Sequence, residues 1–307
     1  MKLYIFTPNK EALFTKEIET TLQDNFDLIF YTSPKPLAEH TDFINDTNEK
    51  IVALDPDYFG WKFSAEEIDL MKNVKAICLQ TTSFSWIDTK HANSKNIPVL
   101  NLKGFSTEAV AEFAFMLALG VARKLPLIIQ ADYKQDFVAH QGVELKGKTA
   151  GVIGLGRIGT SVANKCKGFG MSVQYWSKNS KDDKYQFLDL EKLIATSDVI
   201  FITLAQNEDT AHILTDDILR KMKETTIFVS IAHKVFNEEL ILKMVKDGKL
   251  YGYGTEEDNG NPTKIKGNIL VLPSVAWATK ESMDKNADMW VNSIISAGNG
   301  FLLSEVR

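Results

Sequence analysis

Three glycines, Gly154, Gly156 and Gly159, are spaced as G-x-G-x-x-G within the stretch GVIGLGRIG. In such a turn the first glycine permits a tight bend, the second lets the backbone approach a pyrophosphate, and the third lets a helix pack against a strand. The free N–H groups at the start of that helix favour a phosphate. An apolar run precedes the turn and a helical pattern follows it, so we predict a dinucleotide site that includes Arg157 and Ile158. The alternative is a tight strand-to-helix turn without a ligand.

The residues after the next expected strand bear on which dinucleotide binds. This strand, 171–176, is followed by Ser177 and Lys178, and the first carboxylate after it belongs to Asp182. NAD enzymes usually place an acid here to hold the ribose hydroxyls, whereas a hydroxyl beside a cation suits a 2′-phosphate. We therefore expect NADP(H) in preference to NAD(H). The alternative is that Lys178 and Lys181 are solvated surface lysines.

Apolar runs that alternate with helical patterns predict the elements that position these residues. The alternation indicates an α/β fold with mainly parallel sheets. Helical patterns cover 10–23, an apolar stretch at 106–124 and an amphipathic one at 280–300. The expected strands are 2–6, 27–32, 50–55, 74–80, 149–155, 171–176, 198–205, 226–232, 250–254 and 268–273.

Composition and charge exclude several broad classes of protein. The 307 residues carry a net charge of -5, which argues against a broad nucleic-acid surface. The N-terminus lacks the apolar core of a signal peptide, and no apolar run is long enough to span a membrane. Cys78 and Cys166 lie in unrelated segments, and no Cys/His cluster has metal-ligand spacing. We expect reduced thiols, no metal, no nucleic-acid or membrane partner and a cytoplasmic location, with His40 and His91 at the surface.

Three segments carry a family resemblance. They are AVAEFAFMLALGVAR at 109–123, GVELKGKTAGVIGLGRIGTSVA at 142–163 and SDVIFITLAQNEDTAHIL at 197–214. In this order they resemble the D-isomer-specific 2-hydroxyacid dehydrogenases, a family that includes glyoxylate and hydroxypyruvate reductases. Ala205 stands where the family usually has a proline, and the match assigns it to the cofactor side. The resemblance extends over nearly the whole chain.

The resemblance implies a particular division of the chain. The implied fold is α/β with two Rossmann-like, doubly wound domains, as in formate and glycerate dehydrogenases. A discontinuous, flavodoxin-like substrate domain would comprise 1–100 and 279–307, and a dinucleotide-binding Rossmann domain would comprise 101–278. The helix near 106–124 usually builds a dimer interface in the family, so a homodimer is implied.

The chain departs from the family at its three catalytic positions. Matching the motifs puts Ala232 in place of the substrate-binding Arg, Asn261 in place of the Glu, and Ser274 in place of the proton-transferring His. Glu256 matches the Asp that opens the Glu motif, and it is assigned to the cofactor side. No His follows His233, so no small shift of the alignment restores the catalytic set.

Several residues are candidates for the missing roles. His233 follows a strand that ends at the cofactor side of this fold, and it is the best remaining acid–base group. Ser274 can hydrogen-bond a carbonyl, and the adjacent Lys234 can hold an anionic group. In the loop QTTSFSWID, Ser83 replaces the glycine that the family usually has, and Phe84 is a bulky neighbour, so both are candidate substrate contacts.

Three functions compete at this point. The first is an NAD(P)-dependent oxidoreductase that acts on CH–OH donors, or on the corresponding small carbonyl substrate, with atypical catalytic residues. The second is a catalytically inactive NAD(P)-binding sensor or regulatory dimer, which the loss of all three catalytic residues favours. The third is a structural dimer that binds no nucleotide.

Overall fold

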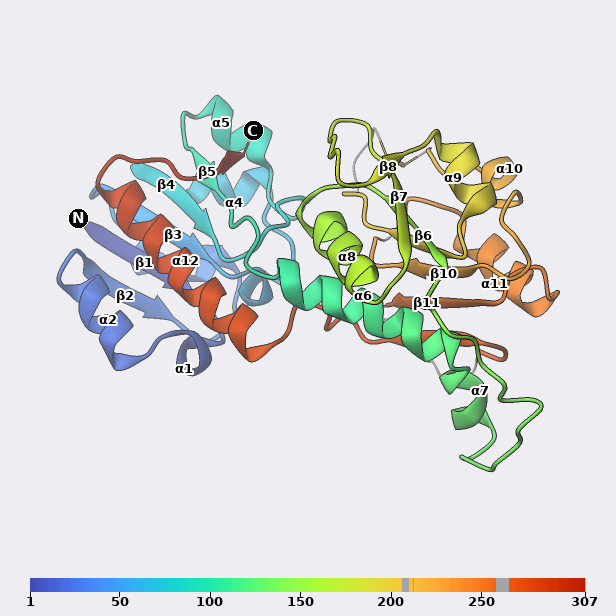
Figure 1. The fold of residues 1–307 in the computed structure, drawn as a ribbon. Helices are drawn as coiled ribbons and strands as arrows, with labels where there is room; N and C mark the ends of the chain where they lie inside the picture. The colour runs from blue at the N-terminus through green and yellow to red at the C-terminus, as the bar shows by residue number, and fades with distance from the viewer. Residues whose placement is uncertain (206–209, 212, 233, 258–264, 307) are drawn as a thin grey trace. The chain divides into compact units, whose positions relative to one another are not determined.

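The computed structural model describes residues 1–205, 210–211, 213–232, 234–257 and 265–306. The chain divides into two compact units. Unit 1 comprises Met1–Ser106 and Lys280–Arg307, and unit 2 comprises Thr107–Thr279. Figure 1 shows both units as α/β structures with a central sheet. The predicted α/β fold class is confirmed by two sheets whose strand pairs are parallel except at one edge.

Unit 1 is built on a sheet in the order β13-β5-β4-β3-β1-β2, of which only β13 is antiparallel within the described chain. Alternate residues of each strand face opposite sides, and each side is covered by its own apolar core. The strands are β1 Lys2–Phe6, β2 Asp27–Tyr31, β3 Lys50–Leu54, β4 Val74–Leu79, β5 Val99–Leu100 and β13 Glu305–Val306.

The long C-terminal helix of unit 1 packs across one face of this sheet. Its Trp290 is fully buried and donates a hydrogen bond from Nε1 to the carbonyl oxygen of Cys78, at 3.0 Å. The helical pattern predicted over 10–23 is split into α1 and α2, because Thr15 caps the second helix by accepting from the N–H of Ile18. The helices are α1 Lys10–Leu13, α2 Lys16–Gln23, η1 Leu37–Glu39, α3 Thr41–Asn45, η2 Pro56–Phe59, α4 Ala65–Leu70, α5 Thr89–Ser94 and α12 Lys280–Gly298.

The expectation that His40 lies at the surface is wrong. This side chain is buried against the rings of Phe6 and Tyr31, and its Nε2 lies 3.1 Å from the hydroxyl of Tyr58. Burial lowers the pKa of His40 because the charged imidazolium loses its hydration. His91 is half-buried and contacts Asp69 through its Nε2.

Unit 2 is built on a parallel sheet in the order β12-β11-β10-β9-β6-β7-β8, counted over its described strands. The chain starts at β6 and moves to β7 on one side and to β9 on the other, so the strand order reverses there. Open α/β sheets bind ligands at such a switch point. The strands are β6 Thr149–Ile153, β7 Ser172–Trp176, β8 Gln186–Phe187, β9 Val199–Ile202, β10 Ile227–Ser230, β11 Gly252–Glu256 and β12 Ile269–Leu272.

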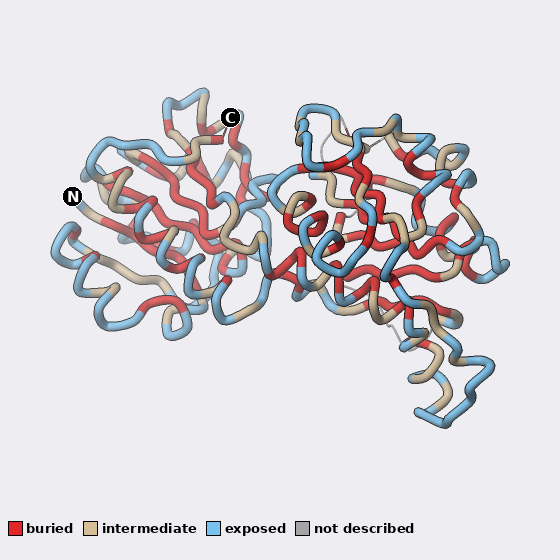
Figure 2. The backbone as a smooth tube through the Cα atoms, in the orientation of Figure 1, coloured by how far each residue is buried: buried red, intermediate tan, exposed pale blue. Residues whose placement is uncertain are grey.

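Two helices of unit 2, α6 and α8, lie against each other over the buried strands that Figure 2 shows in red. The carboxylate of Glu108 on α6 accepts from Ser161 and from Lys165 of α8, at 2.8 Å and 2.6 Å. In the described part of the chain, no helix has both the length and the apolar character that crossing a membrane requires. The helices are α6 Thr107–Ala122, α7 Leu125–Gln130, α8 Arg157–Gly168, α9 Leu190–Thr196, α10 Asp216–Leu219 and α11 Glu238–Lys246.

Candidate active site

The glycine turn links the switch-point strand β6 to α8. Its first residue, Gly154, has a φ of +99°, a backbone conformation that side chains strongly disfavour. The N–H of Gly154 donates to the carbonyl oxygen of Trp176 at 2.9 Å, which ties the turn to the end of β7. The chain therefore reverses at the carboxyl edge of the sheet, between β7 and β9.

The third glycine makes the closest contact of the turn. A Cβ added to Gly159 would lie 2.0 Å from the carbonyl oxygen of Gly154 and 2.8 Å from Oγ1 of Thr203. Thr203, just after β9, donates from Oγ1 to that same carbonyl oxygen at 2.6 Å. Sequence reasoning did not identify Thr203 as a residue that holds the turn. Its only signal was a polar residue at the end of an apolar strand.

The second glycine leaves the start of α8 open. Gly156 is the N-cap residue, no side chain caps it, and a Cβ placed there would meet nothing within 4 Å. The first N–H groups of an α-helix have no partners within the helix, and the helix dipole favours an anion at this end. Arg157 is exposed and Ile158 is half-buried in the first turn. An open cradle at an uncapped helix start fits a pyrophosphate.

Ser177 and Lys178 lie directly beside this turn. They follow β7, whose last residue Trp176 is paired in register with Ile153 of β6. The half-buried Ser177 accepts a hydrogen bond from the N–H of Ser180 at 3.2 Å, and Lys178 is exposed. The structure thus brings a hydroxyl and a cation to the strand end where the sugar of a dinucleotide is held in this fold.

The loop after β10 contains Ala232, which the motif match puts in place of the family's arginine. Ala232 is buried there, and its N–H and carbonyl oxygen both bond to the hydroxyl of Ser230, at 3.2 Å and 2.8 Å. Lys234 is exposed and has a φ of +56°. His233, the predicted acid–base group, lies outside the described residues. So does Asn261, at the position of the family's Glu.

Glu256 and the segment that contains Ser274 come together at the ends of β11 and β12. The buried Glu256 accepts from the N–H of Ala276 at 3.0 Å. The N–H of the next residue, Glu257, donates to the carbonyl oxygen of Leu272 at 2.8 Å. Within the described chain, the buried hydroxyl oxygen of Ser274 has no hydrogen-bond partner. This edge therefore combines a fixed carboxylate with a hydroxyl that retains its capacity to bond.

Ala205, assigned to the cofactor side, is exposed after β9. Its carbonyl oxygen accepts from the hydroxyl of Thr210 at 2.7 Å.

In unit 1, the loop after β4 presents Ser83 and Phe84 to solvent. Two donors converge on the carbonyl oxygen of Ser83, namely Oγ1 of Thr81 at 2.7 Å and Nε1 of Trp86 at 3.0 Å. The amide of Asn101 also donates to the loop, to the carbonyl oxygen of Thr82 at 2.7 Å. These bonds fix the loop backbone while the two candidate side chains remain accessible.

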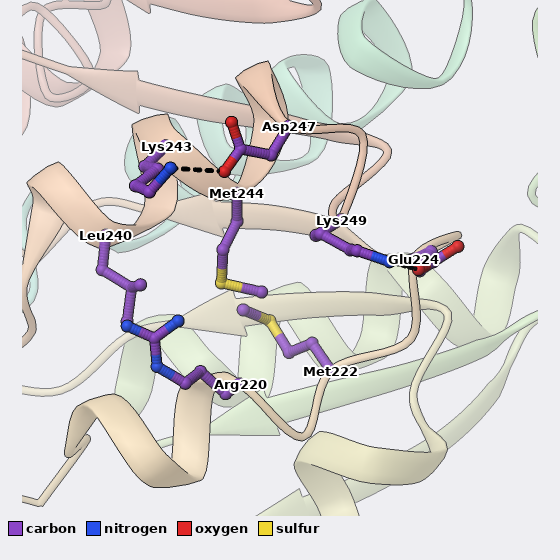
Figure 3. A pocket seen from close by; sticks show the side chains of 8 residues that line it. All are labelled: Arg220, Met222, Glu224, Leu240, Lys243, Met244, Asp247 and Lys249. Atoms are coloured by element: carbon purple, nitrogen blue, oxygen red, sulfur yellow. Dashed lines mark hydrogen bonds and ion pairs between the residues drawn. The ribbon is translucent and has the colours of Figure 1, made fainter.

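A surface cavity of about 420 Å³ lies elsewhere on unit 2 (Figure 3). Ion pairs between Lys243 and Asp247 and between Lys249 and Glu224 border it. Glu224 and Lys249 precede β10 and β11, so the cavity lies at the amino edge of the sheet, opposite the glycine turn. Its lining is Arg220, Met222, Glu224, Leu240, Lys243, Met244, Asp247 and Lys249.

Comparison with known proteins decides the family. Residues 115–278 match the model of the NAD binding domain of D-isomer specific 2-hydroxyacid dehydrogenases. The chain belongs to this family. A glyoxylate reductase from Thermofilum pendens is 30% identical over 78% of this chain and 76% of its own length. A glyoxylate reductase from Korarchaeum cryptofilum is 29% identical over 77% of this chain and 76% of its own length.

Solved structures share the fold over nearly the whole chain. An acyclic imino acid reductase in complex with NADPH and D-Arg has a TM-score of 0.85, with 23% identity and 100% of both chains covered. A glyoxylate reductase from Paecilomyes thermophila has a TM-score of 0.84, with 22% identity over 99% of this chain and 98% of its own. The implied fold with two Rossmann-like domains is confirmed.

Membership of the family settles the class of function. This 2-hydroxyacid dehydrogenase homologue is an NAD(P)-dependent oxidoreductase, and the glycine turn falls within the matched NAD binding domain. The first of the three competing functions is confirmed at this level. The comparisons offer no support for the inactive sensor.

Two alanine substitutions separate folding from nucleotide binding. The methyl group of Gly156→Ala contacts no other part of the fold, so the midpoint of thermal unfolding should stay unchanged. The same methyl group occupies the phosphate cradle and should weaken NADPH binding by about 10-fold or more. Gly159→Ala should instead lower the free energy of unfolding by roughly 1–3 kcal/mol through overpacking. Fluorescence titration and thermal unfolding measure the two effects. Unchanged binding by Gly156→Ala contradicts the assignment of the cradle.

Proposed function

We propose that this chain reduces a small carbonyl substrate to the alcohol with NADP(H) as the preferred cofactor. The observation that carries the proposal is the uncapped start of α8 at Gly156, where the backbone is open to a pyrophosphate. A bound nicotinamide supplies the hydride. The chain itself must hold the cofactor, orient the carbonyl group and transfer a proton.

The cofactor is held by residues at the carboxyl edge of the unit 2 sheet. Gly154, Gly156 and Gly159 shape the turn, and the first turn of α8, with Arg157 and Ile158, receives the phosphates through its N–H groups. Ala205, after β9, and Glu256, at the end of β11, lie on the other side of the switch point, and these residues would hold the nicotinamide half. Unit 2 is thereby the dinucleotide-binding domain, and unit 1 is the substrate domain.

The preference for NADP(H) rests on the end of β7. Ser177 and Lys178 follow β7 beside the turn and offer a hydroxyl and an ammonium group. Between the end of β7 and Asp182 there is no carboxylate that would accept hydrogen bonds from the ribose hydroxyls. A 2′-phosphate gains a charge-assisted hydrogen bond from the lysine and meets no like charge. NADPH bound to the imino acid reductase supports the capacity of this fold for that cofactor.

Proton transfer and substrate contact are assigned to atypical residues. With a buried alanine at 232, the segment has no guanidinium to bind a carboxylate, and His233 is the acid–base group. The hydroxyl of Ser274 is assigned to the substrate carbonyl, and a local movement must uncover this buried group when the substrate binds. Lys234 holds an anionic group of the substrate. Ser83 and Phe84 contact the substrate from the substrate domain.

We further propose that the protein is a cytoplasmic homodimer. The segment between α7 and β6 exposes Tyr133, Phe137 and Val138, and the exposed fractions of the last two are 82% and 84%. Such apolar exposure marks an interaction surface that a second copy of this chain would cover. The family resemblance implies a homodimer built on the helix near 106–124, and this segment follows that helix in the chain. Cys78 and Cys166 are buried free thiols, as in a reducing compartment.

Ser177→Asp tests the cofactor preference. A carboxylate at this position repels the 2′-phosphate and accepts from ribose hydroxyls, so the ratio of kcat/KM for NADPH over NADH should fall at least about 10-fold. Ser172→Asp, the same change at the other end of β7, is the matched control and should leave the ratio unaltered. A wild-type preference for NADH would refute the proposal.

His233→Ala tests the proton transfer. Loss of a general acid should lower kcat by about 10²-fold while NADPH binding is retained. His91→Ala, on α5 of unit 1 where the imidazole contacts Asp69, is the control. Steady-state oxidation of NADPH at 340 nm measures both variants. Unchanged turnover removes His233 from the mechanism.

Phe137→Glu tests the dimer. A charge in the covered apolar surface should weaken self-association at least about 10-fold, which sedimentation velocity measures as a shift from dimer to monomer. Phe187→Glu, at a half-exposed phenylalanine of β8, is the control and should remain dimeric. A monomeric wild-type protein at micromolar concentration would disprove the homodimer.

A further inference from the structure

Trp61 in unit 1 has an unusual backbone for a large, exposed side chain. Its φ is +59°, in the left-handed region that bulky residues strongly disfavour, and 51% of its surface is exposed. The preceding Gly60 adopts a similar conformation, with a φ of +59° and a ψ of 36°. Because half of the Trp61 surface is exposed, burial of the ring does not offset the backbone strain. Strained residues of this kind concentrate at functional sites.

Specific contacts hold the ring of Trp61 in one orientation. Its Nε1 donates to Oδ1 of Asp57 at 2.9 Å, and its ring meets that of Trp86 edge to face, with 6.5 Å between centroids. Trp86 is itself buried and bonded to the carbonyl oxygen of Ser83. The side chain of Trp61 is thus fixed at the surface, and through Trp86 it contacts the loop after β4.

The strand ends of unit 1 place Trp61 beside the candidate substrate loop. Phe63 donates its N–H to the carbonyl oxygen of Trp86 at 2.7 Å, and its carbonyl oxygen accepts from the N–H of Asp88 at 3.2 Å. The segments 61–63 and 84–88 therefore run side by side. Both follow the carboxyl ends of their strands, β3 and β4, the edge at which open α/β sheets take ligands.

Trp61, Phe84 and Trp86 form what we call the aromatic edge. Trp61 and Trp86 are in ring contact, and Phe84, two residues before Trp86 in the same loop, is 37% exposed. The hydroxyls of Ser83 and Ser85, 3.4 Å apart and exposed, lie in the same loop and supply the polar part. A rigid apolar surface with a few adjacent hydroxyls is typical of a small-molecule site.

We propose that the aromatic edge selects carbonyl substrates that carry an aromatic or similarly bulky apolar group. This inference rests on the proposed reductase function and adds the substrate class. A planar apolar group gains contact area and favourable edge-to-face geometry on Trp61 and Phe84. A methyl group or a hydrogen in its place gains little, so compounds as small as pyruvate are poor substrates.

The test uses matched pairs of probe carbonyls with the purified full-length chain and NADPH or NADH. Phenylpyruvate is compared with pyruvate, and phenylacetaldehyde with acetaldehyde. The wild type should prefer the phenyl member of a pair, and Trp61→Gly should reduce the phenyl-to-methyl ratio of kcat/KM by about 10-fold. Trp61→Phe keeps a ring and should retain most of the ratio.

A control variant and a stability measurement complete the design. Phe301→Ala removes a 69% exposed aromatic ring elsewhere in unit 1 and should leave the ratio unchanged. Glycine adopts a positive φ without strain, so Trp61→Gly should unfold within a few degrees of the wild type. A wild type that prefers the methyl compounds, or a ratio that Trp61→Gly leaves unchanged, overturns the aromatic edge.

Failure of the proposed function gives a different result. If none of the four carbonyls is reduced, the reductase assignment fails for these classes, and binding decides the inference. Titration calorimetry then measures the affinities of the protein for phenylpyruvate and for pyruvate in the presence of saturating NADPH. Selective binding of phenylpyruvate that is lost in Trp61→Gly supports the aromatic edge. Equal or undetectable binding overturns it.

Discussion

The contact between α8 and the end of β6 constrains the rest of unit 2. Gly159 allows the helix to approach until only a hydrogen atom fits against the carbonyl oxygen of Gly154, and Thr203 bonds to that same oxygen. This approach puts the uncapped helix start at the switch point of the sheet, beside β7 and β9. A larger residue at 159 would displace α8, and the dipole of this helix would no longer point at the position proposed for the phosphates.

The sequence predicted those features that depend on local patterns. The glycine spacing, the apolar strands and the two long helices are local patterns, and each is found in the structure. Thr203 was missed because its partner lies 49 residues away and only the fold brings them together. His40 was misjudged for the same reason, since a histidine between turns gives no local sign of burial among distant aromatic rings. The predicted helix over 10–23 is divided at Thr15, the N-cap of α2, because the apolar spacing continues through this residue and does not mark it as a helix start.

The candidate catalytic residues were predicted less completely than the cofactor turn. A phosphate is held by backbone N–H groups, so glycine spacing alone reveals the site. Acid–base chemistry depends on side chains whose partners come from separate strands. The contact of Glu256 with the N–H of Ala276 joins the ends of β11 and β12, and no spacing in the sequence announces it. The substitutions at 232 and 274 were readable only against the family pattern.

The proposed function divides the work between the two units, with the cofactor in unit 2 and the substrate in unit 1. Hydride transfer requires the same cofactor geometry for every substrate, so the turn in unit 2 has little freedom to vary. Recognition of the substrate has no such constraint, and loops at strand ends can change without disturbing the sheet beneath them. The strained Trp61 is found in such a loop, and its fixed, half-exposed ring is the reason that we assign it to the substrate. Under the proposed function, alanine at 232 leaves no guanidinium there to bind a substrate carboxylate, and apolar contact with the exposed rings of unit 1 is the physical means that we propose for recovering affinity.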